Sequence, residues 1–178
     1  MNRLHSVPVA EATGHAAQLF AAIKSAVGMV PNAYVGIGSN SPHALEAGLN
    51  LDAALKKGSL SGREIEAVKL VVSEVADCDY CLAAHTMIGK TQGLGAAAMT
   101  ALRRGEASGD ARLDALSSLA RALVETRGLI PADVLDGVRR AGYTDAQIVD
   151  VVLAITSITF TNLFNRLNDT TLDFPPAG

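Results

Sequence analysis

Apolar residues recur along the chain with the spacing of an α-helix. Between residues 14 and 28, Leu19, Ile23 and Val27 follow one another at four-residue intervals, which places them on one helical face. The same period returns in later segments, and no stretch alternates apolar and polar residues between hairpin turn signals. The chain is rich in Ala and Leu, and aromatic residues make up only 4% of it. These patterns predict an all-α fold.

Residues 39–58 form a predicted helix with clear boundaries. Ser41 is a suitable N-cap and Pro42 takes the first helical position, where its missing N–H costs nothing. Two lysines and then Gly58 close the segment, which is typical of a helix C-terminus.

The segment 60–77 has the clearest helix start in the chain. Ser61 and Glu64 have the spacing of a capping box, and Leu60 and Ile65 take the positions of a hydrophobic staple. Further helices are expected in 94–104, 111–128, 131–142 and 144–160, with a flexible connection at 103–111.

A weak internal repeat appears when the chain is shifted by 83 positions. Residues 61–78 then align with 144–161, and the second copy has its own capping pair, Thr144 and Gln147. Behind each pair the apolar positions coincide. The likeness fits two related helical hairpins, and it fits equally two capped, buried helices that are similar by chance. The second copy contains no cysteine, so any thiol chemistry belongs to the first.

The length, composition and charge of the chain indicate how many domains it has and which partners it is expected to lack. A chain of 178 residues has the length of one domain, so we expect a single domain over 1–178. Charged residues interrupt every apolar run before the roughly 18 residues of a membrane span, and the N-terminus lacks the apolar core of a secretory signal. We therefore expect a soluble, cytoplasmic protein that does not bind a membrane. The net charge of −3 with scattered Lys and Arg argues against a nucleic-acid partner.

The stretch "CDYCLAAH", residues 78–85, contains both cysteines of the chain and one of its four histidines. If a helix begins near Asp77, then Cys78, Cys81 and His85 share one helical face. Closely spaced cysteines in a cytoplasmic chain indicate metal or redox chemistry. The first turn of a helix and a nearby imidazole both favour a reactive thiolate, although the two flanking aspartates oppose it at the first cysteine. The three residues are therefore candidate catalytic residues.

Glu66 lies twelve positions before Cys78, about 18 Å away in a continuous helix. If the chain instead reverses near Ala76 and Asp77, the axial offset between Glu66 and His85 falls to about 5 Å. The carboxylate can then orient the imidazole and support it as a base. Glu66 is therefore the fourth candidate.

Other interpretations of the motif stay open. A structural zinc site can use the two thiols and the imidazole but needs a fourth ligand, and the sequence offers no second CxxC or paired-histidine motif. Haem attachment is excluded, because it requires a histidine where Leu82 stands. Two inert cysteines can also pack in a core. The sequence contains neither GxGxxG nor a phosphate loop, so we expect no cofactor and no metal. His5, His15 and His43 are expected in solvated or capping positions.

The stretch Leu60–His85, "LSGREIEAVKLVVSEVADCDYCLAAH", resembles the alkylhydroperoxidase D-like (AhpD-like) branch of the carboxymuconolactone decarboxylase superfamily. The redox motif spans 66–85, and the segments on either side resemble the peroxidase-related members. The resemblance implies an all-helical fold, homotrimers or hexamers, and reduction of small hydroperoxides. It implies that Cys81 attacks the peroxide to form a sulfenic acid, that Cys78 condenses with it, and that His85 and Glu66 relay protons.

The resemblance also implies that electrons come from a dithiol or from a lipoyl- or thioredoxin-like protein. Analogy with thioredoxin favours Cys78 as the reactive thiol instead, because it lies nearer the helix end. The best-known members have a histidine where this chain has Tyr80, which affects rate and substrate preference. Two alternatives to a peroxidase remain, namely a CxxC redox or stress-response module without useful turnover and a zinc-binding structural protein.

Overall fold

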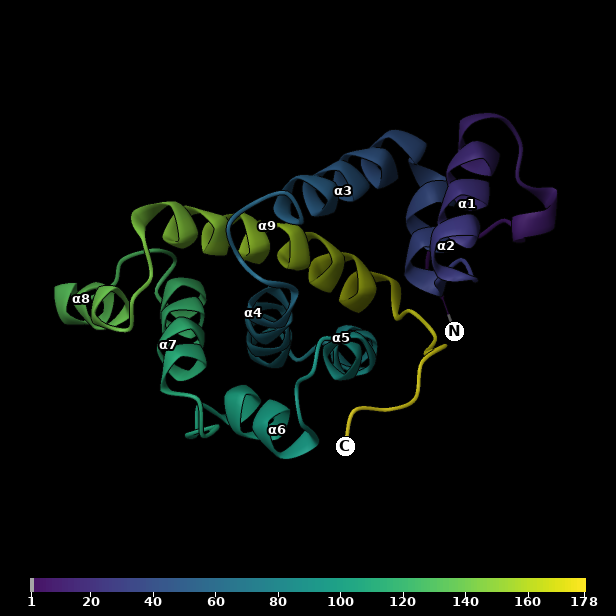
Figure 1. The fold of residues 1–178 in the computed structure, drawn as a ribbon. Helices are drawn as coiled ribbons and strands as arrows, with labels where there is room; N and C mark the ends of the chain where they lie inside the picture. Colours follow the sequence, from purple (N-terminus) through teal and green to yellow (C-terminus); the bar gives the residue numbers. More distant parts are fainter. Residues whose placement is uncertain (1) are drawn as a thin grey trace.

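The computed structural model describes residues 2–178, and within them the chain forms helices and no strand. The all-α prediction is therefore confirmed. The elements in chain order, labelled as in Figure 1, are η1 (Val9–Glu11, a 3-10 helix), α1 (Gly14–Val27), α2 (Asn32–Asn40), α3 (Pro42–Leu55), α4 (Gly62–Val75), α5 (Asp79–Thr91), α6 (Ala96–Arg104), α7 (Ala111–Glu125), α8 (Ala132–Arg140) and α9 (Asp145–Asn168).

Helix α4 is the central element of the fold. It packs against α5, α6, α7 and α9, which lie around it in Figure 1. Every residue from Glu64 to Ser73 is buried. Burial on all sides is typical of a core helix, and it means that any polar side chain on α4 needs a partner inside the protein.

The capping boxes predicted at Ser61 and at Thr144 are both present. The Glu64 N–H donates to the Ser61 hydroxyl, and the Ser61 N–H donates to the Glu64 carboxylate. Thr144 and Gln147 make the same pair of bonds at the start of α9. The likeness then ends, because the chain turns after α4 whereas α9 continues as one helix of 24 residues.

The N-terminal helices α1, α2 and α3 form a second, smaller core around Phe20, Ile37 and Leu45. Helix α2 was not predicted from the sequence, because its two glycines disfavour a helix. The structure explains them. A Cβ atom on Gly38 would lie 2.5 Å from the ring of Phe20, and one on Gly36 would lie 2.9 Å from the ring of Phe164. The glycines let α2 approach α1 and α9 closely, and packing then outweighs the poor local propensity.

Helix α9 combines a buried face with an exposed apolar one. By length and composition alone, it is the one helix in 2–178 that could cross a membrane, a test that core helices also pass, and it packs against α2, α3, α4, α5 and α7. Apolar side chains with heptad-like spacing are nevertheless exposed along it, and we call them the α9 stripe: Val149, Val152, Leu163 and Leu167.

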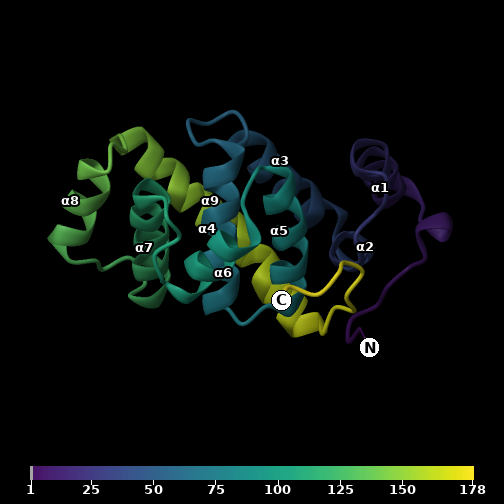
Figure 2. The same ribbon diagram turned by 60° about the horizontal axis from the view of Figure 1, so that its bottom comes forward.

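The segment after α9 returns to the N-terminal helices. The Asn32 N–H at the start of α2 donates to the Asp173 carboxylate over 2.7 Å, and the Phe174 ring meets the Tyr80 ring edge-on. Figure 2 shows this yellow tail beside α5 and α2. The tail therefore forms part of the wall around the start of α5, where the CxxC motif lies.

Candidate active site

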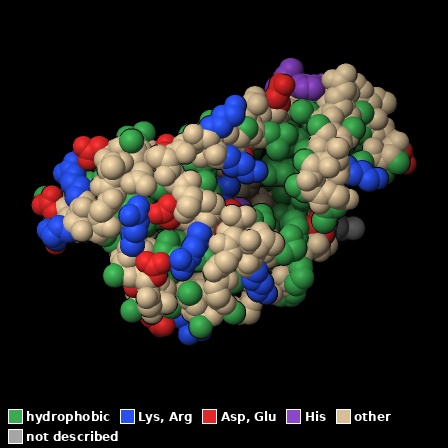
Figure 3. Space-filling view, in the orientation of Figure 1, with side chains coloured by type: hydrophobic (Ala, Val, Ile, Leu, Met, Phe, Trp, Pro, Cys, Tyr) green, Lys and Arg blue, Asp and Glu red, His purple; other side chains and the backbone are tan. Residues whose placement is uncertain are grey.

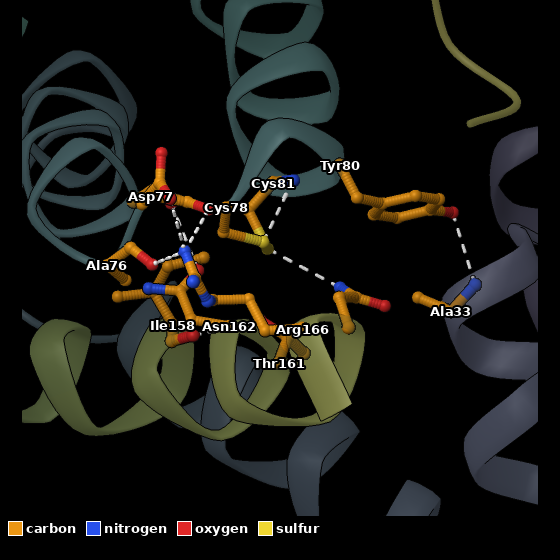
Figure 4. The surroundings of a disulfide bond; sticks show 12 residues. Ala33, Ala76, Asp77, Cys78, Tyr80, Cys81, Ile158, Thr161, Asn162 and Arg166 are labelled. Carbon is orange, nitrogen blue, oxygen red and sulfur yellow. Dashed lines mark hydrogen bonds and ion pairs between the residues drawn. A yellow bond between two sulfur atoms is a disulfide. The ribbon is translucent and has the colours of Figure 1, made fainter. Parts of the chain in front are cut away.

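The turn between α4 and α5 brings the motif back against α4. Asp77 has a positive φ of 53°, the left-handed conformation that ends many helices, and the Cys78 N–H donates to the Ser73 carbonyl over 3.0 Å. Arg166 of α9 secures the turn by donating to the carbonyls of Ala76 and Asp77 and by pairing with the Asp77 carboxylate over 2.9 Å. Figure 4 shows these contacts converging on the guanidinium.

The two cysteines lie at the start of α5. Cys78 is its N-cap residue, and its Sγ accepts from the Cys81 N–H over 3.4 Å. Cys78 and Cys81 form a disulfide with a Cα–Cα distance of 5.3 Å, and each residue is 2% exposed. On the other side, the Asn165 Nδ2 group donates to the Cys81 sulfur over 3.4 Å. The dashed line from the sulfur to α9 in Figure 4 marks this bond.

Glu66 and His85 meet across the two helices that the turn connects. Glu66 Oε2 lies 2.7 Å from His85 Nδ1, and both side chains are largely buried. This is the contact expected from a chain reversal at Ala76 and Asp77. Because Nδ1 is held by the carboxylate, the Nε2 atom of the ring is the one left to exchange a proton with a ligand.

A cavity of about 350 Å³ connects Cys81 with the Glu66–His85 pair, and we call it the Cys81 cavity. Its walls are mainly apolar, and they include Val27, Met29, Ala84, Met87, Ile88 and Phe174. Figure 3 shows the hollow bordered by apolar side chains. Cys78 does not line this cavity, so Cys81 is the one cysteine of the pair that lines the same cavity as Glu66 and His85.

An ion pair between a buried lysine and a partly buried aspartate lines the Cys81 cavity. Lys69 is 7% exposed, and its Nζ atom lies 2.7 Å from Asp52 Oδ1. The Ser157 hydroxyl donates to the same oxygen over 2.6 Å. Burial would raise the pKa of Asp52, but the Lys69 charge and the bonds from Lys69 and Ser157 lower it below its usual value. The sequence analysis missed these residues, although a lysine three positions after Glu66 inside an apolar helix was an available signal.

Two tyrosines complete the cavity wall. The Tyr80 hydroxyl accepts from the buried Ala33 N–H over 3.1 Å, so it connects α5 to α2. Burial raises the pKa of Tyr80 well above its usual value, and burial with the charges of Asp52 and Glu66 raises the pKa of Tyr34 to about 12. Both side chains are therefore neutral phenols near neutral pH, and Tyr80 touches the site as its place in the motif suggested.

The other histidines lie away from this site. His15 on α1 and His43 on α3 approach Glu46, and the possible ligand atoms of the three residues lie within 4.8 Å of one another. Within 2–178, this is the group whose donor atoms could converge on a metal ion. It includes none of the four candidate residues of the CxxC site.

The carboxymuconolactone decarboxylase family model matches residues 42–125. The matched segment runs from the start of α3 to the end of α7 and contains all four candidate residues. No curated protein sequence matches the chain.

Solved structures share the whole fold. An uncharacterized peroxidase-related protein from Ralstonia eutropha JMP134, described as an alkylhydroperoxidase AhpD core, has a TM-score of 0.83 at 19% identity, with 97% of this chain and 92% of that chain covered. A peroxidase-related protein from Silicibacter sp. TM1040 has a TM-score of 0.77 at 21% identity, covering 99% and 95%. The debrominase Bmp8 has a TM-score of 0.79 at 17% identity, covering 96% and 92%. These likenesses establish an AhpD-like fold.

Proposed function

We propose that the chain is a thiol-dependent peroxidase for small hydroperoxides, because the carboxymuconolactone decarboxylase family model matches residues 42–125 and the chain has the AhpD-like fold. The observation that carries this proposal is the Cys81 cavity, which one cysteine of the CxxC pair lines together with the Glu66–His85 pair. A nucleophilic thiol, an oriented base and a partner thiol at bonding distance are the groups that peroxide reduction requires.

In the first step, the reduced protein uses Cys81 as the nucleophile. His85 takes the thiol proton while Glu66 holds the ring. The thiolate attacks the outer oxygen of the hydroperoxide, the O–O bond breaks, and Cys81 becomes a sulfenic acid. The alkoxide that leaves receives the proton back from His85 and departs as an alcohol.

In the second step, Cys78 resolves the sulfenic acid. Its thiol gives up a proton and the resulting thiolate attacks the Cys81 sulfur. The S–O bond breaks, and the hydroxide takes up that proton and leaves as water. The product is the Cys78–Cys81 disulfide seen in the structure. A dithiol or a lipoyl- or thioredoxin-like protein then reduces the disulfide, and two electrons and two protons restore both thiols.

Asn165 is suited to orient the substrate in the first step. It lines the Cys81 cavity, its Nδ2 donates to the Cys81 sulfur, and its buried Oδ1 has no protein partner among the described residues. A buried acceptor without a partner is costly. The O–H group of a hydroperoxide bound beside Cys81 would satisfy it, with the organic part against the apolar wall.

We also propose a homo-oligomer, a trimer or hexamer, located in the cytoplasm. The α9 stripe supports self-association, because exposed apolar side chains in a row are typical of a surface that another chain covers. A cytoplasmic location would supply the thiol reductants that the cycle consumes.

The test is steady-state consumption of a small organic hydroperoxide with excess dithiol. We expect turnover in the wild type and its loss in both Cys78→Ser and Cys81→Ser. In Cys78→Ser, a sulfenic-acid trap should label Cys81. Unchanged turnover in Cys81→Ser would contradict the proposal. Oxidation to the disulfide with no steady turnover under any dithiol would instead favour a redox or stress-response module, and stoichiometric zinc in protein purified without added metal would favour a structural zinc protein.

A further inference from the structure

The two cysteines of the disulfide line two different cavities. Cys81 lines the apolar Cys81 cavity, whereas Cys78 lines a second, polar cavity of about 420 Å³. We call the second one the Cys78 groove, and its wall combines the first turn of α5 with the end of α9 and the segment that follows. Tyr80 and Asn165 line both cavities and so form the partition between them.

We propose that a small dithiol without negative charge enters the Cys78 groove and attacks Cys78, on the side of the disulfide opposite the hydroperoxide cavity. The assignment of the Cys81 cavity to the hydroperoxide rests on the proposed function. The entry of the reductant through the Cys78 groove does not. A thiolate attacks a disulfide in line with the bond that breaks, so an attack on Cys78 comes from the side away from Cys81. The Cys78 groove borders Cys78 and not Cys81, as this approach requires.

The bonds and electrons balance in this exchange. The entering thiolate forms a bond to the Cys78 sulfur, the Cys78–Cys81 bond breaks, and Cys81 leaves with the electron pair as a thiolate. Asn165 Nδ2, which already donates to that sulfur, stabilises the leaving group. The second thiol of the reductant then attacks its own sulfur in the mixed disulfide, and Cys78 is released. The two protons of the dithiol end on the two cysteines, and the reductant leaves as a cyclic disulfide.

The charges around the Cys78 groove select among thiols. Among the described residues that line it, Asp77 and Asp79 flank Cys78, and Arg166 lies opposite. Arg166 is held by the Asp77 carboxylate and by the Ala76 and Asp77 carbonyls, and Asp79 is exposed in the first turn of α5. The Asp79 carboxylate therefore places negative charge beside Cys78, which disfavours an anionic thiol and favours a neutral or cationic one.

The first experiment separates the two faces by steric block. Leu172 lines the Cys78 groove and Met87 lines the Cys81 cavity, and both side chains are partly exposed, at 42% and 41%. We expect Leu172→Trp to slow reduction of the disulfide by dithiothreitol at least about fivefold, and to leave oxidation of the reduced protein by hydroperoxide unchanged. Met87→Trp should slow oxidation by hydroperoxide and leave reduction by dithiothreitol unchanged. A slower reduction in Met87→Trp with an unchanged one in Leu172→Trp would overturn the proposal.

The second experiment tests the charge selection without a large side chain. Reduction rates of the oxidised wild type are compared for cysteamine, 2-mercaptoethanol and mercaptoethanesulfonate, each corrected for its thiolate fraction. We expect the cationic thiol to exceed the anionic one by about tenfold at low salt, with the ratio falling as salt rises. Asp79→Lys should reverse the order, whereas Asp133→Lys, the same charge change on α8, should not. The same order in both variants would overturn the proposal.

The reduction measurements in both experiments do not depend on peroxidase activity. Reduction is followed on the purified disulfide form in the absence of peroxide. If hydroperoxide does not oxidise the reduced protein, the proposed function fails, and the entry route through the Cys78 groove is still decided by the reduction rates.

Discussion

The Nδ1 atom of His85 lies 2.7 Å from the Oε2 atom of Glu66, although 19 positions separate the two residues. The contact exists because the chain reverses between α4 and α5, and because Arg166 holds that reversal from α9. The pair is therefore a product of the turn, and the position of the imidazole next to Cys81 depends on both helices that flank it.

The first prediction concerns this pair. His85→Asn removes the base, and we expect kcat/KM for hydroperoxide to fall by about 10² to 10³. Glu66→Gln keeps the size of the side chain but removes the charge that orients the ring, and we expect a smaller loss of about tenfold. Because the two residues act as one unit, the double variant should lose little more than His85→Asn alone.

Glu74→Gln is the matched control for this prediction. It makes the same change on the same helix, but Glu74 pairs with Arg103 and is absent from the Cys81 cavity. Its kcat/KM should equal that of the wild type. Fully additive losses in the double variant would show that Glu66 and His85 act independently, which would contradict the relay.

The second prediction concerns the ion pair that lines the Cys81 cavity. Asp52→Asn leaves the Lys69 ammonium buried without a counter-charge, and we expect the free energy of unfolding to fall by about 3 kcal/mol at neutral pH. Urea titration measures this value. Asp136→Asn on the exposed face of α8 should change it by less than about 0.5 kcal/mol.

The pH dependence of stability follows from the lowered pKa of Asp52. Between the folded and unfolded pKa values, the unfolded chain binds the extra proton, so stability rises with pH. The contribution of Asp52 to stability is fully present above the usual carboxyl pKa of 3.8. It is lost as pH falls through the lower pKa that Asp52 has in the folded protein. We expect the free energy of unfolding of Asp52→Asn to depend less on pH in this acid range than that of the wild type. An equally strong pH dependence in the variant would show that Asp52 does not cause the loss of stability in acid.

The third prediction concerns the position where the better-known relatives have a histidine. Tyr80→Phe keeps the ring against Phe174 but removes the hydroxyl that accepts from the buried Ala33 N–H. Leaving that donor without an acceptor should cost about 1 to 3 kcal/mol of stability. Denaturant unfolding measures the loss. A variant as stable as the wild type would show that the Ala33 N–H finds another acceptor, so that Tyr80 does not hold α2 to α5.

The parts that the sequence predicted correctly depend on local patterns. The capping boxes of Ser61 and Thr144 require three or four consecutive residues, and the structure contains both. The approach of Glu66 to His85 was also predictable, because the only unknown was where the chain turns, and helix geometry supplied the rest.

The parts that the sequence did not predict depend on contacts between distant segments. In the sequence, Gly36 and Gly38 disfavour a helix. The structure shows that the rings of Phe164 and Phe20 pack against them, which explains why glycine stands there. Asp52 and Ser157 join Lys69 from α3 and α9, and no spacing in the chain connects them. The division of the two cysteines between two cavities likewise needs α9 and the C-terminal segment in place.

The last prediction concerns the α9 stripe. Val149, Val152 and Leu163 recur at intervals of 3 and 11 positions, a spacing that keeps them on one face of the helix and suits a seam between two helices. Leu163 is 68% exposed in the single chain, so Leu163→Glu should leave the monomer core intact. If copies of the chain associate through this face, burying the new carboxylate would be unfavourable, and the variant should separate into smaller species.

Light scattering coupled to size-exclusion chromatography measures the mass of each species. Leu129→Glu is the control, because Leu129 is 84% exposed in the connection between α7 and α8 and lies outside the α9 stripe. We expect an oligomer for the wild type and for Leu129→Glu, and a monomer or smaller assembly for Leu163→Glu. An oligomer of unchanged mass in Leu163→Glu would place the interface on another face, and a monomeric wild type would contradict the proposed assembly altogether.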